Sequence, residues 1–93
     1  MKKFKSILQN DPDFCYICGM KATETHHCIG GTSRRKLADK DGLYVRLCHD
    51  CHQSLHDHNT QKERLQKIAQ AAWMEKYGKS VDEWRERYIK SYL

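Results

Sequence analysis

The clearest hydrophobic pattern in the chain lies in its last third, where apolar residues recur with helical spacing. They occupy positions i, i+3, i+4, i+7 and i+8 of one segment: Leu65, Ile68, Ala69, Ala72 and Trp73. This spacing puts all of them on one face and predicts an amphipathic helix. Gly78 marks its end, because glycine readily adopts the left-handed conformation that follows many helices.

A second, shorter helix is predicted after residue 79. Ser80 and Glu83 have the spacing of a capping box, in which the two side chains satisfy backbone N–H groups at a helix start. The apolar stripe that follows is Val81, Trp84, Tyr88 and Tyr92. We interpret its aromatic residues as core anchors, so residues 61–93 are predicted to support the rest of a single domain, 1–93, from one side.

Two short strands are predicted in the first half of the chain. Thr23 to Ile29 forms the first and ends at the glycine pair 30–31, and Leu43 to Leu47 alternates apolar and polar residues after an Asp-Gly turn. The polar, basic segment 32–41 between them is predicted to be a loop with at most one helical turn. A further helix is expected to begin near Cys51, which gives an α+β fold.

The composition indicates that this fold has a small core. Only 39% of the 93 residues are hydrophobic, and the mean hydropathy is -0.90. A domain of this size usually needs a metal ion or disulfide bonds for stability. A net charge of +5 favours an anionic partner such as nucleic acid, and no apolar run is long enough to cross a membrane.

The cysteines suggest what stabilises this core. Two C-x-x-C pairs, Cys15 with Cys18 and Cys48 with Cys51, are separated by 29 residues. This is the pattern of a tetrahedral structural zinc site. Two disulfides are the alternative, but the odd number of cysteines and the lack of a signal peptide argue against them. Cys28, between the pairs, is expected to be a small buried side chain.

Four histidines lie in and just after the segment between these pairs. His52 and His56 are four residues apart, so they lie on one helix face and can bind one divalent ion. His26 and His27 lie near the end of the first strand, where strand alternation would send them to opposite faces unless the strand bends. Three imidazoles holding a metal ion and a fourth accepting a proton would be able to hydrolyse a phosphodiester. A purely structural role for these histidines is the alternative.

The combined pattern resembles the HNH (His-Me finger, ββα-metal) endonuclease family, in particular small bacteriophage proteins of that type. The resemblance covers residues 15–58: a C-x-x-C pair, His-His-Cys-Ile at a strand end, and Arg-Leu-Cys before C-x-x-C-H-x-x-x-H. It implies a zinc-stabilised ββα-metal finger followed by two additional C-terminal helices. It also implies that His27 is the general base, that His26, His52 and His56 bind the catalytic ion, and that the four paired cysteines bind structural Zn²⁺.

The resemblance further implies a DNA-cutting enzyme of phage replication, recombination or processing. Its catalytic ion would be Mg²⁺ or Mn²⁺, with Zn²⁺ or Ni²⁺ as alternatives. Double-stranded or branched DNA would be the substrate, phage recombination or packaging proteins are candidate partners, and the cytoplasm of an infected or lysogenic bacterial host is the expected location. Asp41 occupies the neighbourhood of the family's central Asn and is the candidate to hold the loop.

Basic residues crowd the segment between the two predicted strands. Those expected to contact DNA phosphates are Arg34, Arg35, Lys36 and Lys40. Such contacts would be independent of sequence and sensitive to salt. The alternative to an endonuclease is a zinc-stabilised DNA-binding or adaptor module without catalysis, and this would bind DNA and leave it intact.

Overall fold

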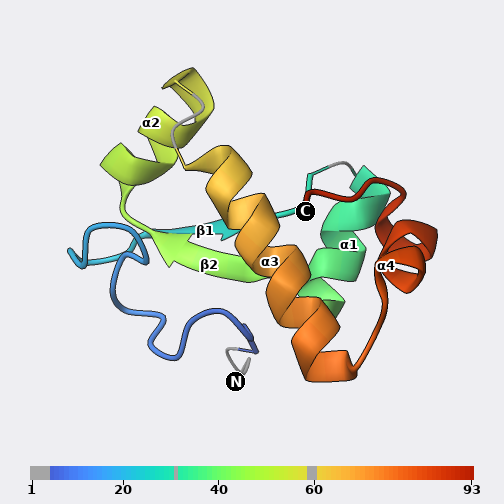
Figure 1. The fold of residues 1–93 in the computed structure, drawn as a ribbon. Helices are drawn as coiled ribbons and strands as arrows, with labels where there is room; N and C mark the ends of the chain where they lie inside the picture. The colour runs from blue at the N-terminus through green and yellow to red at the C-terminus, as the bar shows by residue number, and fades with distance from the viewer. Residues whose placement is uncertain (1–4, 31, 59–60) are drawn as a thin grey trace.

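The computed structural model describes residues 5–30, 32–58 and 61–93, so of the predicted glycine pair only Gly30 is included and Gly31 lies outside the described residues. The elements in chain order are β1 (Glu24–His27), α1 (Thr32–Asp41), β2 (Tyr44–Leu47), α2 (His49–His58), α3 (Lys62–Tyr77) and α4 (Val81–Tyr88) (Figure 1). This confirms a small α+β fold. No helix in the described ranges combines the length and the apolar character needed to cross a membrane.

The two strands pair antiparallel, and their register places the adjacent His26 and His27 on different faces of the sheet. In their register Glu24 lies opposite Leu47 and His26 opposite Val45, whereas His27 lies opposite Tyr44. Because directly opposed residues share a face, Glu24 and His26 lie on the face that carries the buried Val45 and Leu47. His27 is directed to the other face. β1 is also shorter than the predicted strand of residues 23–29.

Residues 32–41 form a ten-residue helix, so the prediction of a loop there is wrong. The segment has too few apolar residues to show helical periodicity, and tertiary packing decides its structure. Ala38 is fully buried and Leu37 packs against the core. The Asp-Gly pair ends the helix: Gly42 has a φ of 78°, and Leu43 N–H donates to the Ala38 carbonyl at 2.8 Å. This is the hydrogen bond of a glycine-terminated helix, not of a hairpin turn.

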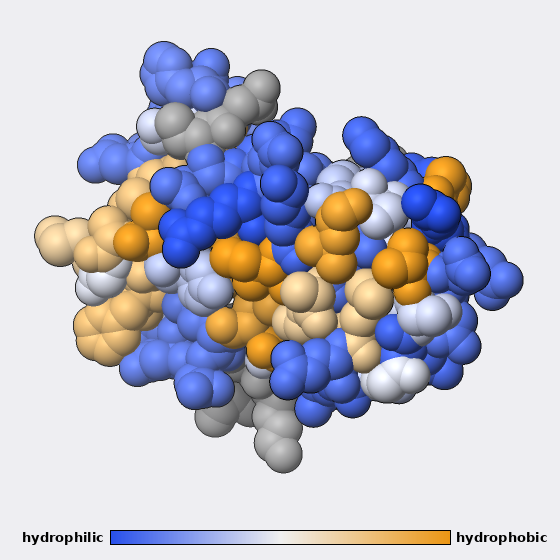
Figure 2. Space-filling view, in the orientation of Figure 1, coloured by the Kyte–Doolittle hydropathy of each residue, from blue (hydrophilic) through white to orange (hydrophobic). Residues whose placement is uncertain are grey.

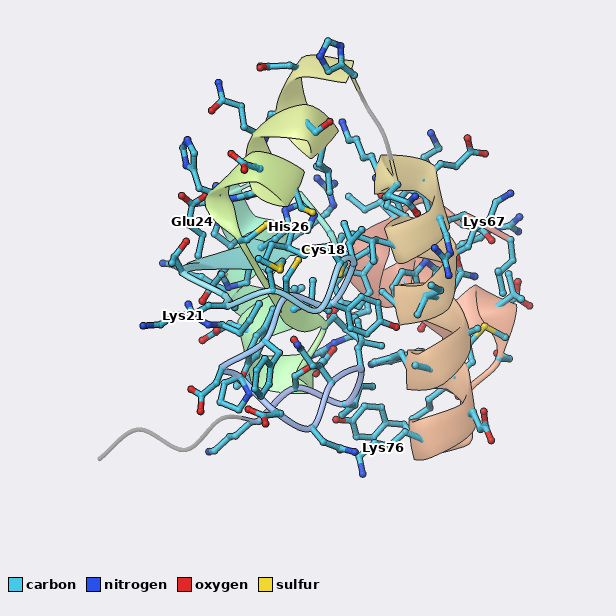
Figure 3. All side chains as sticks on the ribbon, turned by 90° about the vertical axis from the view of Figure 1, so that its left-hand side faces the viewer. Cys18, Lys21, Glu24, His26, Lys67 and Lys76 are labelled. Carbon is cyan, nitrogen blue, oxygen red and sulfur yellow. The ribbon has the colours of Figure 1, made fainter. Side chains whose placement is uncertain are left out.

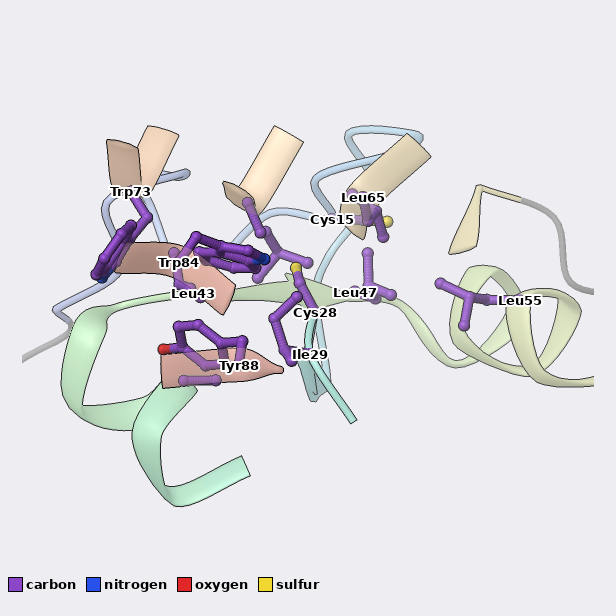
Figure 4. Packing of buried hydrophobic residues seen from close by; sticks show 13 residues of the cluster. Cys15, Cys28, Ile29, Leu43, Leu47, Leu55, Leu65, Trp73, Trp84 and Tyr88 are labelled. Atoms are coloured by element: carbon purple, nitrogen blue, oxygen red, sulfur yellow. The ribbon is translucent and has the colours of Figure 1, made fainter. Parts of the chain in front are cut away.

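The core lies between the sheet and the two C-terminal helices. Figure 4 shows Trp73 and Trp84 close to Leu43 and Tyr88. The ring centres of the two tryptophans are 5.4 Å apart, and their planes meet at 67°. Leu65, Ala69 and Trp73 are buried as the helical stripe predicts. The surface in Figure 2 is mostly hydrophilic, and its apolar residues form separate patches.

Both predicted helix-end signals are confirmed, but the last helix is shorter than expected. Gly78 ends α3 in the left-handed conformation, and Ser80 and Glu83 form both bonds of a capping box. α4 ends at Tyr88, because Ile89 adopts a φ of 72° and the chain reverses. Tyr92 therefore packs against the core from the non-helical segment after α4 rather than from the helix.

Candidate metal centres

The four paired cysteines meet in one cluster. The sulfur atoms of Cys15, Cys18, Cys48 and Cys51 all lie within 4.8 Å of one another, and no disulfide joins them. The Cys18 and Cys48 sulfurs are 3.7 Å apart. A tetrahedral ion with zinc–sulfur bonds of about 2.3 Å places its ligands about 3.8 Å apart, so this donor set fits zinc.

The cysteines of this cluster differ in acidity: burial and hydrogen bonds among the sulfurs raise the pKa values of Cys18 and Cys51, whereas the backbone favours the thiolate of Cys15. Burial raises the pKa of Cys15, but backbone N–H groups of Cys18, Cys48 and Ile17 outweigh it and lower the pKa to about 6. Gly19 has a φ of 79° and closes the first C-x-x-C turn by donating to the Cys15 carbonyl at 2.9 Å. Cys28 stands apart: it is buried in the core, which raises the pKa of its thiol to about 12.

Three histidines form the second cluster. One ring nitrogen each of His26, His52 and His56 lies within 4.8 Å of the others. Figure 3 shows His26 below α2, the helix that carries the other two. The Nε2 atoms of His52 and His56 are 3.2 Å apart. Zinc–nitrogen bonds of about 2.0–2.1 Å in a tetrahedral site require about 3.3 Å between two ligands, so this spacing also fits a divalent ion.

Glu24 orients this cluster and was missed by the sequence-based prediction. Its carboxylate accepts hydrogen bonds from Nδ1 of His52 at 2.6 Å and from Nδ1 of His49 at 2.7 Å. A signal was present in the sequence, because Glu24 precedes His26 by two residues and therefore shares its strand face. His49 is exposed, but it is bound to this carboxylate.

His26 lies deeper in the molecule than a surface histidine. Burial, together with electrostatic interaction with the neighbouring His52 and His56 rings, lowers its pKa from 6.5 to about 4. The ring is therefore neutral near pH 7. A neutral imidazole is the form that binds a metal ion.

His27 is not part of the three-histidine cluster, but it lines a cavity that opens beside the cluster. Its Nε2 atom lies 3.3 Å from a carboxylate oxygen of Asp39, and its ring centre is 5.9 Å from that of Tyr44. Asp39 is the second residue that the sequence-based prediction missed. No sequence pattern indicated Asp39, because the helix α1 that carries it was predicted as a loop.

Asp41 does not hold the backbone beside the histidines. It lies at the end of α1, where its side chain accepts hydrogen bonds from Trp73 Nε1 at 3.0 Å, from Arg87 Nε at 2.6 Å and from the Tyr88 hydroxyl. It therefore joins α1 to α3 and α4. Its role is to fix the C-terminal helices, and this corrects the assignment that the resemblance implies.

A cavity of about 590 Å³ opens beside the histidine cluster. Of the four basic residues predicted to contact DNA, only Arg35 lines it. Arg34, Lys36 and Lys40 lie elsewhere on α1 and do not line it. Lys62, Gln66 and Tyr92, from α3 and the C-terminal segment, complete the wall opposite α2.

Comparison of the chain with protein-family models, with characterised proteins and with solved structures finds no match. The fold and the two clusters therefore define a class of protein. It is a small α+β protein whose four paired cysteines are suited to hold a structural metal such as zinc. The assignment to the HNH family remains a hypothesis that rests on the sequence motif.

Proposed function

We propose that the protein is a metal-dependent endonuclease that hydrolyses DNA phosphodiester bonds, with His26, His52 and His56 as ligands of the catalytic divalent ion. The observation that carries the proposal is the convergence of these three imidazoles beside an open cavity that another imidazole, His27, borders. A site with three protein ligands leaves coordination positions for water and substrate. The motif that resembles HNH enzymes predicts the same set of ligands.

His27 is the proposed general base. An imidazole that binds a carboxylate through one nitrogen keeps the other for proton transfer, and the carboxylate stabilises the imidazolium that forms. Asp39 is placed to do this at Nε2 of His27. When bound, the divalent ion supplies positive charge at the scissile phosphate and the leaving oxygen.

The cysteine cluster supports the site in this proposal. Cys51 and His52 are adjacent at the start of α2, and His52 N–H donates to the Cys48 carbonyl at 3.0 Å. A zinc ion held by the four thiolates would therefore fix the helix that presents His52 and His56 to β1. Arg35, at the cavity wall, is the residue of the basic set best placed to contact a phosphate near the cut.

The test is conversion of supercoiled plasmid to nicked and linear forms by the zinc-loaded protein, with Mg²⁺ or Mn²⁺ added in a titration. His27→Ala should abolish cutting and leave folding and zinc content unchanged. His58→Ala is the matched control, because it removes an exposed imidazole of α2 that lies outside the cluster. It should cut as fast as the wild type.

Two results would contradict the proposal in different ways. Equal cutting by His27→Ala and the wild type would remove His27 from the mechanism. Salt-dependent DNA binding without cutting in any of the metals would identify the protein as the alternative, a zinc-stabilised DNA-binding or adaptor module.

A further inference from the structure

The segment after α4 turns back and forms part of the wall of the histidine cavity. Trp84 Nε1 donates to the Lys90 carbonyl at 2.8 Å, which holds the start of the segment. Gln70 holds the rest: its Nε2 donates to Ser91 Oγ at 3.0 Å and its Oε1 accepts from Tyr92 N–H at 2.6 Å. Gln70 is fully buried, so these bonds are shielded from water and fix Tyr92 at the cavity.

A second hollow, of about 380 Å³, adjoins this cavity. Lys62, Gln66 and Tyr92 line both, and the second hollow continues to Lys90 and Ser91. Together the two form a groove that starts at the histidine cluster and runs between the beginning of α3 and the C-terminal segment. We call this second hollow the C-terminal groove; it is lined by Lys62, Glu63, Gln66, Lys90, Ser91 and Tyr92.

The C-terminal groove is positively charged. Neither Lys62 nor Lys90 has a carboxylate within ion-pair distance in the described parts of the chain. The one acidic residue that lines it, Glu63, pairs with Lys67 at 3.5 Å. Lys90 Nζ lies 5.8 Å from the centre of the Tyr92 ring, and the Tyr92 hydroxyl makes no hydrogen bond within the described residues. Unpaired ammonium groups and a free hydroxyl donor in a groove suit the phosphates of an extended polyanion.

We propose that the C-terminal groove binds the DNA backbone on one side of the scissile phosphate. Lys62 and Lys90 would contact successive phosphates, and the Tyr92 hydroxyl would donate to a phosphate oxygen where the groove meets the histidine cavity. This inference rests on the proposed endonuclease function, because the histidine cluster defines where the cut phosphate lies. It gives the two C-terminal helices a part in substrate binding as well as in stability.

The test measures binding of a labelled DNA duplex of about 20 base pairs by fluorescence anisotropy, without added divalent metal, across a salt series. In the double variant Lys62→Gln/Lys90→Gln the affinity should fall about tenfold, and the slope of log K against log salt should fall by about two. The matched control is Lys21→Gln/Lys76→Gln, which removes the same charge from residues that line neither hollow and lie away from His26 in Figure 3. Tyr92→Phe, which keeps the ring, should weaken binding about threefold.

The outcomes separate this proposal from the endonuclease proposal. A control variant that loses as much affinity and slope as Lys62→Gln/Lys90→Gln would overturn the groove, because only the total charge would matter. The absence of wild-type binding would overturn it as well. A protein that never cuts plasmid but binds duplex through Lys62 and Lys90 would contradict the endonuclease proposal and support the groove.

Discussion

The carboxylate of Glu24 lies 2.6 Å from Nδ1 of His52 and joins the first strand to the helix that follows the second. Because an ionised carboxylate only accepts hydrogen bonds, neutral His52 carries its proton on Nδ1 and directs the Nε2 lone pair toward His56. Metal-binding histidines in proteins are commonly held in this way. Glu24 thus orients His52 within the three-histidine cluster.

Replacing this carboxylate should weaken metal binding without removing a ligand. In Glu24→Gln the affinity of the zinc-loaded protein for Mn²⁺ should fall about 10- to 100-fold, the range typical of the loss of such a partner. The measurement is a calorimetric titration.

His49→Ala is the matched control for Glu24. It removes the other partner of the same carboxylate and leaves the Glu24–His52 hydrogen bond in place. It should keep Mn²⁺ affinity within about twofold of the wild type. Equal losses in both variants would show that Mn²⁺ affinity depends on the Glu24–His49 contact as much as on the orientation of His52 by Glu24.

The cysteine cluster should account for one zinc ion per chain. Cys51→Ser is expected to lose the zinc and to reduce the helical circular dichroism signal, because Cys51 lies in the first turn of α2. A strong chelator should do the same to the wild-type protein. Elemental analysis after dialysis measures the zinc.

Cys28→Ala serves as the control for the zinc prediction. Cys28 is a buried free cysteine outside the cluster, so its loss should leave the zinc content unchanged. Loss of zinc from this variant would mean that Cys28 is a ligand, and the assignment of the four paired cysteines would then be wrong.

Asp41 should be a major determinant of stability. Its side chain is 12% exposed and accepts hydrogen bonds from Trp73, Arg87 and Tyr88. Asp41→Ala would leave these donors without their acceptor, and we expect the free energy of unfolding to fall by about 3 kcal/mol. Urea denaturation measures the change. Asp39→Ala, two residues earlier on α1 and 55% exposed in its side chain, should cost less than about 0.5 kcal/mol.

The two candidate metal clusters were the most predictable part of the molecule. The C-x-x-C pairs and the i, i+4 histidines are local patterns, and both are brought together in the structure. α3 and the start of α4 were also predictable, because apolar periodicity, a terminal glycine and a capping box are local signals.

What the sequence did not reveal depends on contacts between distant residues. Among the α1 side chains whose burial is described, only Ala38 is fully buried, and the one other apolar side chain, Leu37, is partly buried, so no apolar stripe indicated a helix. Asp41 is polar and next to a glycine, which is typical of a turn, yet its partners lie 32 to 47 residues later in the chain. The C-terminal wall of the cavity depends on Gln70, and nothing in the local sequence marks that glutamine as buried.

The lowered pKa of His26 predicts how stability changes with pH. The unfolded chain takes up a proton at this residue below about pH 6.5, whereas the folded protein does so only near pH 4. Between these values the unfolded state binds more protons, so the free energy of unfolding falls as the pH is lowered and is unaffected by His26 above this range. At pH 5 the loss from this group is at most about 2 kcal/mol, because each pKa unit corresponds to about 1.4 kcal/mol.

His26→Leu isolates this contribution, because leucine does not titrate and suits a partly buried position. The difference in unfolding free energy between variant and wild type, without added divalent metal, should shift by up to about 2 kcal/mol in favour of the variant from pH 7 to pH 5. Other titrating groups largely cancel in this difference. His58→Leu, at an exposed position of α2, should show no such shift. A difference for His26→Leu that stays constant with pH would mean that the folded protein accepts the proton as readily as the unfolded chain does, and that His26 is not held in its neutral form for metal binding.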